Sequence, residues 1–444
     1  MMNSNPNSSV ENAASTTSST PSLSSNSSTI PVSSSTPTPT IPKRITANTE
    51  DKRRPEDQLP DDAEITKAME ILPKNYNFEI KKCITRLRAV NARRIGLQMP
   101  EGLLMFACMI GDILSHFTNN SEIIILGDVT FGACCVDDLG AAALNCDFLI
   151  HYGHSCLVPI DMTVSRVKML YVFVDISFDT HHLCDTIIAN FSSTMKLGLL
   201  GTIQFASSLY TLKQQLLPIF PNISIPQAKP LSPGEVLGCT SPKLDALNLD
   251  AYIFIADGRF HLESVMIHNP TIPAYRYDPY SKRMTKESYD TPAMHNQRQQ
   301  AIAKASQGKR FGLILGTLGR QGNPGILSRL EKKLIENNKE YFILLLSEIS
   351  PQRLAKFKDH VDAWIQIACP RLSIDWGTGF EHAPLLNPYE AEVALGYIPW
   401  QDTYPMDYYA RGSGSWTNYY KESKTNETSK INMKTTVANI ENKF

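Results

Sequence analysis

Apolar runs alternate with amphipathic stretches through the centre of this 444-residue chain. Three segments open alike, with a basic residue and then an apolar strand start: RIGL at 94–97, KLGL at 196–199 and RFGL at 310–313. A helix-like stretch follows each one, at 103–117, 206–220 and 324–338. Strands that alternate with helices predict parallel sheets with crossover helices between the strands.

The internal spacing of these segments is nearly constant. Each contains a further strand that begins with an acid, which lies 51, 52 and 50 residues after the glycine of the opening strand. The glycines are Gly96, Gly198 and Gly312, and the acids are Asp147, Asp250 and Asp362. Between these two strands the first segment has an apolar run, Ile123–Leu126, that predicts a buried strand. The third segment has a similar run, YFILLL at 341–346, and the second has only the short ISIP at 223–226. Constant spacing in three segments predicts a triplicated unit.

The expected fold class is therefore α/β: three similar small domains with parallel sheets, arranged around a common centre with pseudo-threefold symmetry. They are expected at 65–195, 196–308 and 309–417, the last with a tyrosine-rich docking strap at 404–411. Residues 1–64 are expected to be a disordered tail, because their start is rich in Ser, Thr, Asn and Pro and has little apolar surface to bury. A polar C-terminal tail is expected at 418–444.

Composition excludes some classes of protein. Lys and Arg number 43 against 44 Asp and Glu, so the chain has no basic surplus for direct nucleic-acid binding. No apolar run is long enough to span a membrane, and the N-terminus lacks the pattern of a signal peptide. Nine cysteines without the density of a disulfide scaffold fit a reducing compartment. A cytoplasmic protein is expected.

Adjacent thiols stand out in GDVTFGACCVDD at 127–138. Neighbouring cysteines on a strand point to opposite faces, so only one of Cys134 and Cys135 can serve a given site. Ligand-facing loops follow the carboxyl ends of parallel strands, and one cysteine per repeat lies at such an end: Cys134, Cys239 and Cys369. By contrast, four cysteines fit helix or strand interiors and are expected in the core: Cys83, Cys108, Cys146 and Cys184.

A single cysteine is most often a small core residue, but equivalent positions in three repeats favour a shared site. Three soft thiolates without a fourth ligand fit an iron–sulfur cluster with one iron left open. Structural zinc is the alternative, since His151 or His154 could close the site as a fourth ligand.

Other strand ends carry polar groups with two possible roles. The loop Gly316–Gly322 resembles a phosphate-cradling loop and equally fits a tight turn between a strand and a helix. Asp257, Arg259 and His261 could contact a ligand, or could simply mark the start of a helix at 258–264. Asp375–Gly377 fits an ordinary turn.

Seven motifs follow one another along the chain: GDVTFGACCVDD, HYGHSCLVP, ADGRFHLES, YRYDPYSK, LGTLGRQGNP, ACPRLSIDWG and LLNPYEAEVAL. Together they closely resemble the eukaryotic 2-(3-amino-3-carboxypropyl)histidine synthases, which perform the first step of diphthamide biosynthesis. The likeness covers about residues 65–417 and leaves out both tails. It implies a transferase: a non-canonical radical S-adenosylmethionine enzyme that lacks the usual CxxxCxxC loop.

The resemblance also implies the ligands of a [4Fe-4S] cluster. They are Cys134 (favoured over Cys135 because it directly follows Gly-Ala), Cys239 and Cys369, with the fourth iron open to S-adenosylmethionine. The implied reaction transfers the 3-amino-3-carboxypropyl group to C2 of a histidine on translation elongation factor 2. Candidate contacts for S-adenosylmethionine are Gly316, Thr317, Gly319, Arg320, Asp257, Arg259 and His154.

The implied partners are a homologous second subunit in a heterodimer and a small metal-binding protein that donates electrons. Two alternatives remain at this stage. The chain could be the non-catalytic scaffold or electron-relay subunit of that complex, although it has a full cysteine triad. It could also be a quinolinate-synthase-like enzyme, which joins three similar α/β domains around a three-cysteine cluster, although the motifs do not look like that family.

Overall fold

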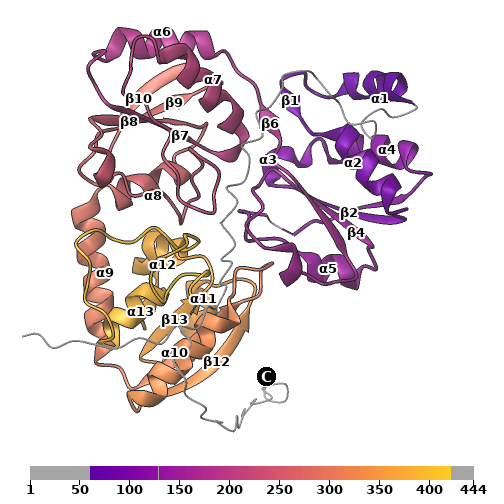
Figure 1. Ribbon diagram of the computed structural model, residues 1–444. Helices are drawn as coiled ribbons and strands as arrows, with labels where there is room; N and C mark the ends of the chain where they lie inside the picture. Colours follow the sequence, from indigo (N-terminus) through magenta and orange to yellow (C-terminus); the bar gives the residue numbers. More distant parts are fainter. Residues whose placement is uncertain (1–60, 129, 422–444) are drawn as a thin grey trace, which may run out of the picture. The chain divides into compact units, whose positions relative to one another are not determined.

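The computed structural model describes residues 61–128 and 130–421, and its helices and strands alternate as the sequence predicts (Figure 1). Three four-stranded sheets carry the repeats. In the first, β3 (Glu122–Ile125), β2 (Arg94–Gln98), β4 (Phe148–Tyr152) and β5 (Lys168–Val172) lie side by side and all run parallel. In the third, the order is β12 (Glu340–Leu346), β11 (Arg310–Gly316), β13 (Ala363–Ile367) and β14 (Leu385–Leu386), again parallel.

The second sheet keeps this plan with one strand missing and one added. Its order is β7 (Leu197–Gly201), β8 (Ala251–Ile255), β9 (Ala274–Asp278) and β10 (Arg283–Glu287). Where the other sheets have an edge strand, β7 has isolated parallel bridges, from Gly198 to Ser224 in the short ISIP and from Gly201 to Glu235. The added strand β10 is antiparallel, and so is the small pair of β1 (Tyr76–Asn77) and β6 (Asp175–Ile176). The prediction of parallel sheets therefore holds for the three repeats but not for every strand.

The constant spacing has a physical cause in the aspartate that directly precedes β4, β8 and β13. In each repeat its carboxylate accepts hydrogen bonds from backbone N–H groups at the start of the first strand. The pairs are Asp147 with Arg93 and Arg94, Asp250 with Lys196, and Asp362 with Lys309 and Arg310. One residue thus fixes the register of two parallel strands in all three sheets.

The repeated glycine has a packing role. Gly96, Gly198 and Gly312 lie opposite Leu149, Tyr252 and Trp364 on the neighbouring strand. A Cβ at Gly312 would collide with the indole ring of Trp364. At Gly312 the glycine leaves room for Trp364, and at Gly96 a Cβ would come tight against Leu149, whereas at Gly198 it would meet Leu249 first.

Helices connect the strands. The three predicted helical stretches form α4 (Ala107–Phe117), α7 (Ala206–Leu216) and α10 (Pro324–Glu336). The predicted helix start near 258 is also correct, because ADGRFH leads into α8 (Phe260–His268). The other helices are α1 (Asp62–Ala68), α2 (Ile80–Ala89), α3 (Glu101–Leu104), α5 (Asp138–Ala143), α6 (Thr180–Asn190), α9 (Thr291–Ser306), α11 (Pro351–Leu354), α12 (Arg371–Trp376) and α13 (Pro388–Ala394).

Two burial predictions are wrong. Ile123–Leu126 was expected to form a buried strand, but β3 is the edge strand of its sheet and its residues are half-buried or exposed, and only Leu126, just after it, is buried. Cys108 was expected in the core and is exposed, whereas Cys83, Cys146 and Cys184 are buried as predicted. The first error arises because an edge strand leaves apolar side chains in contact with solvent, and the second because Cys108 lies on the solvent-facing side of α4.

The ends of the described region also adjust the predicted boundaries. Helix α1 begins at Asp62, within the stretch predicted as the N-terminal tail. Beyond 417, the Tyr419 hydroxyl donates a hydrogen bond to the Leu157 carbonyl. The remaining tail predictions, for 1–60 and 422–444, lie outside the described residues. No helix between 61 and 421 is long and apolar enough to cross a membrane. The three-domain division and its threefold arrangement stay predictions.

Candidate functional site

Cys134, Cys239 and Cys369 line one cavity of about 60 Å³. Each comes from a different repeat, and none is in a disulfide. Cys369 follows β13 by two residues, and Cys239 lies in a turn closed by pairing of Leu237 with Thr240. The structure thus brings together the three cysteines that the sequence singled out.

Cys134 is not on a strand, although the prediction that only one of Cys134 and Cys135 can serve a site assumed that both lie on one. It lies in a turn between β3 and α5, so strand alternation does not separate it from Cys135. Cys134 lines the cavity and Cys135 does not. Cys135 is buried and its sulfur accepts a hydrogen bond from Gln321 Nε2 at 3.2 Å. The geometry favours Cys134 as the cavity thiol.

Gln98, at the end of β2, holds the turn that carries Cys134. Its Nε2 donates to the Cys135 carbonyl at 2.8 Å, and its Oε1 accepts from the Asp137 backbone at 3.1 Å. His151 Nδ1 lies 2.8 Å from the same Oε1. In the third repeat Gln366 holds the turn at Cys369 in the same way, because its Nε2 donates to the Cys369 carbonyl at 2.9 Å. Buried amides at strand ends therefore shape two of the three cysteine turns.

An arginine from the third repeat links its loop to the Cys134 turn. Arg320 forms a bidentate pair with Asp138, whose carboxylate is buried at the start of α5. The Arg320 backbone N–H donates to the Cys134 carbonyl at 2.8 Å. Gly319 has a positive φ of 54° and packs so closely on the Cys135 backbone that a Cβ would collide with it. The Gly316–Gly322 loop is thus, in large part, a contact between repeats.

A second arginine links the Cys369 and Cys239 segments. Arg371 is buried, two residues after Cys369, and its Nη1 donates to the carbonyls of Gly238 at 3.2 Å and Phe260 at 2.8 Å. Its guanidinium also pairs with Glu263 and Asp375. Because Gly238 precedes Cys239, this network fixes the two cysteine turns relative to each other.

The predicted strap closes the site from the C-terminal side. Asp407 pairs with Thr240, and the Tyr408 backbone donates to the Cys239 carbonyl at 3.3 Å. Tyr409 lines the cysteine cavity, and burial together with the nearby thiols raises its pKa well above the usual value. Sequence reasoning missed Tyr409 and Gln321 as cavity residues, because only long-range contacts bring them there.

The histidines predicted as the fourth ligand of a zinc site are not in the cavity, although another histidine is. The histidine that lines the cavity is His261, and neither His151 nor His154 does so. Burial lowers the pKa of His261 and of His154 to about 4, which keeps both imidazoles neutral. Across residues 61–128 and 130–421, no three Cys, His, Asp or Glu side chains are grouped around a position for one metal ion.

Burial controls the state of the cavity thiols. It raises the pKa of Cys239 to about 12 and that of Cys369 to about 11. The pKa of Cys134 is also raised, first by its hydrogen bond with Cys135 and then by burial. The same hydrogen bond lowers the pKa of Cys135 to about 6. The cavity thiols are thus neutral at pH 7 until a cation offsets the cost of forming thiolates.

We expect slow alkylation of these thiols in the metal-free protein. The thiolate is the reactive form, so at pH 7.5 iodoacetamide should modify Cys239 and Cys369 at least about 100-fold more slowly than the exposed Cys108. The rates should rise with pH towards the raised pKa values. Peptide mass mapping over time measures each site, and equal rates at all three cysteines would contradict the burial argument.

A larger cavity of about 330 Å³ adjoins the first and shares four lining residues with it: Phe131, Phe260, Gln321 and Cys369. Gly316 and Leu346, at the carboxyl ends of β11 and β12, contribute to its wall. This position, at the carboxyl ends of parallel strands, is where α/β proteins bind ligands.

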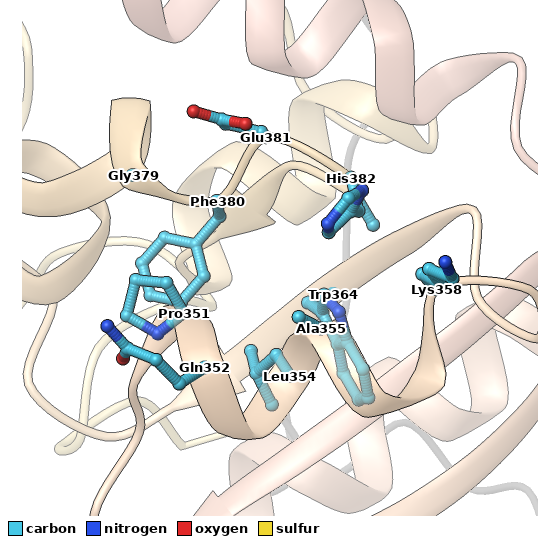
Figure 2. Close-up of a pocket in the computed structure, with 11 residues that line it drawn as sticks. Pro351, Gln352, Leu354, Ala355, Lys358, Trp364, Gly379, Phe380, Glu381 and His382 are labelled. Carbon is cyan, nitrogen blue, oxygen red and sulfur yellow. The ribbon is translucent and has the colours of Figure 1, made fainter.

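The predicted contacts for S-adenosylmethionine are only partly gathered there. Gly316 lines the larger cavity. Thr317, Gly319, Arg320 and His154 do not line either cavity. Arg259 is exposed and pairs with Glu263 and Glu287, and the exposed Asp257 accepts a hydrogen bond from Arg276 at its carbonyl. A separate cavity of about 200 Å³ in the third repeat, lined by Pro351, Trp364 and Phe380 among others, contains none of the predicted residues (Figure 2).

Comparison with known proteins places the chain in a family. The family model for diphthamide synthesis proteins matches residues 99–405. A crystal structure of Dph2 from Pyrococcus horikoshii with a 4Fe-4S cluster superposes with a TM-score of 0.61 and 26% identity, over 74% of this chain and 93% of that one. The chain belongs to the diphthamide synthesis family.

Similar curated relatives share one name, 2-(3-amino-3-carboxypropyl)histidine synthase subunit 1. The protein from Dictyostelium discoideum is 56% identical over 82% of this chain and 78% of its own length. Those from Schizosaccharomyces pombe and Homo sapiens are 54% and 56% identical, over 83% and 79% of this chain and 85% and 79% of their own lengths. Family membership bears out the resemblance read from the motifs and leaves the quinolinate-synthase-like alternative without support.

Proposed function

We propose that this chain transfers the 3-amino-3-carboxypropyl group from S-adenosylmethionine to C2 of a histidine imidazole on translation elongation factor 2, the first step of diphthamide biosynthesis. The observation that carries this proposal is the convergence of Cys134, Cys239 and Cys369 on one cavity. The shared name of the relatives supports the reaction class, and the cluster named for the Pyrococcus protein supports the cofactor.

The residues of the cavity fit a [4Fe-4S] cluster. Three thiols without a disulfide supply three ligands, and soft thiolates are the ligands that iron–sulfur clusters take. Leu157, Leu237 and Ala133 give the cavity apolar walls, which suit a cluster shielded from water. When bound, such a cluster supplies one electron at low potential to a carbon–sulfur bond of S-adenosylmethionine.

The remaining work falls to the protein. Arg320 and Arg371 hold the three cysteine turns in place, and the strap covers the Cys239 turn. The larger cavity would hold S-adenosylmethionine against Cys369, with Gly316 allowing close backbone approach. Placement in that cavity, rather than intrinsic reactivity, would select the bond to the γ-carbon of the methionine part.

The proposal includes partners and a compartment. The relatives are named as a first subunit, which supports a heterodimer with a homologous second subunit. A small metal-binding protein would deliver electrons, and the reaction would take place in the cytoplasm. If the chain is instead a non-catalytic scaffold subunit, it should keep the cysteine cavity but cleave no S-adenosylmethionine.

Product analysis tests the proposed function. With dithionite, the reconstituted chain and its partner subunit should convert S-adenosylmethionine to methylthioadenosine, and one histidine of elongation factor 2 should gain the aminocarboxypropyl mass. Dominant 5'-deoxyadenosine would indicate cleavage at the other carbon and a conventional radical enzyme. An intact cluster that yields neither product would favour the scaffold role.

A further inference from the structure

Three exposed aromatic side chains, one from each repeat, line the larger cavity beside the cysteine site. Phe131, Phe260 and Trp376 are 70%, 44% and 65% exposed. Phe131 and Phe260 line the cysteine cavity as well. Large aromatic residues left exposed together are typical of interaction sites. We call these three side chains the aromatic rim and infer that they bind a partner.

The three rings differ in how firmly they are held. The guanidinium of Arg371 lies 4.2 Å from the ring centre of Phe260, and the His261 ring meets the same ring edge-on at 5.4 Å. Across the described parts of the chain, no aromatic or cation–π pair includes Phe131 or Trp376. Phe260 is thus a fixed platform, and the faces of the other two rings are open to a partner.

The sizes of the cavities restrict what can enter. About 330 Å³ is near the lower end of the range for small-molecule sites, and the cysteine cavity adds about 60 Å³. Neither cavity admits a folded domain. A protein substrate must therefore insert a loop past the rim for its imidazole to reach the thiol site.

The charges favour a basic or neutral loop over an acidic one. Of the residues that line the larger cavity, Glu348 and Asp375 are acids and Arg371 is the single base. Arg371 is already paired with Asp375 and Glu263. Glu348 in turn pairs with Arg353, so the lining has no free positive charge that would attract an acidic loop.

We propose that Phe131, Phe260 and Trp376 are the docking surface for the histidine-bearing loop of the protein substrate. This rests on the proposed function. Aromatic faces suit an imidazole, because two flat rings stack with little loss of side-chain freedom. The aromatic rim binds the loop, and S-adenosylmethionine binds deeper in the cavity, near Gly316 and Cys369.

Steady-state kinetics with two substrates test the proposal. Phe131→Ala and Trp376→Ala alter exposed side chains and should cost little folding stability. In the reconstituted chain with its partner subunit, cluster absorption and methylthioadenosine formation are measured in parallel, because both side chains also line the cavity proposed for S-adenosylmethionine. The KM for elongation factor 2 should rise at least about tenfold, the scale of one interface hot spot. Phe173→Ala is the matched control, an exposed phenylalanine outside both cavities, and should leave this KM unchanged.

Two outcomes would overturn the docking surface. An unchanged KM for elongation factor 2 in both variants is one. The other is a loss of S-adenosylmethionine cleavage without a change in that KM, which would assign the rim to S-adenosylmethionine. Equilibrium binding of elongation factor 2 to the full complex, measured in parallel, separates the two proposals. Tenfold weaker binding in the variants would support the docking surface. Absence of methylthioadenosine with the wild type would refute the proposed function but not the docking surface.

Discussion

Replacing any one of Cys134, Cys239 or Cys369 with serine should remove most of the iron and the broad visible absorption from the reconstituted chain. All three thiols line one cavity, and a cluster that loses one of three protein ligands has no nearby substitute. Cys135 is the nearest other thiol, but it is buried outside the cavity and bonded to Gln321. Iron and sulfide analysis with absorption spectra measures the loss.

Matched controls come from the same chain. Cys83→Ser and Cys184→Ser alter buried cysteines of the repeat cores, far along the chain from the cavity lining, and should keep the full iron content. Full cluster retention in Cys239→Ser would refute the shared site, because Cys239 is the single thiol that the second repeat contributes to the cavity.

The second large effect concerns the ion pair between repeats. Arg320→Met should lower the free energy of unfolding by about 3 kcal/mol, because it leaves the buried Asp138 carboxylate without its charged partner. It should also reduce iron content, since Arg320 holds the Cys134 turn. Chemical denaturation and iron analysis measure the two effects.

Arg353→Met is the control for this pair. Arg353 pairs with Glu348 at the surface, and both side chains are at least half exposed, so its loss should cost less than about 1 kcal/mol. The double change Arg320→Met with Asp138→Leu removes both charges and should restore part of the stability. Equal effects of Arg320→Met and Arg353→Met would show that the pair does not hold the repeats together.

Much of this architecture can be predicted from local sequence, because the same residues do the same work three times. The aspartates at 147, 250 and 362 bond the start of a neighbouring strand, and the glycines at 96, 198 and 312 each pair with a large residue on that strand. These constraints act over a fixed distance along the chain, so they leave a constant spacing. One cysteine turn per repeat then suffices to predict a common site.

Other features depend on contacts that no local pattern encodes. The exposure of β3 follows from its place at the edge of a sheet, which strand order decides. Cys134 lies in a turn because Gln98, from a neighbouring strand, bonds that turn. Gln321 and Tyr409 reach the cysteine cavity only when the third repeat and the strap pack against the others. Neither residue type signals such a role by itself.

If three cysteines from three repeats hold a single cluster with an open iron, that iron should respond to S-adenosylmethionine. The wild-type chain should be reconstituted anaerobically, analysed for iron, reduced, and examined by electron paramagnetic resonance with and without S-adenosylmethionine. We expect about four irons per chain and a signal that changes when S-adenosylmethionine binds. Fewer than about one iron per chain, or a full cluster whose signal ignores S-adenosylmethionine, would contradict it.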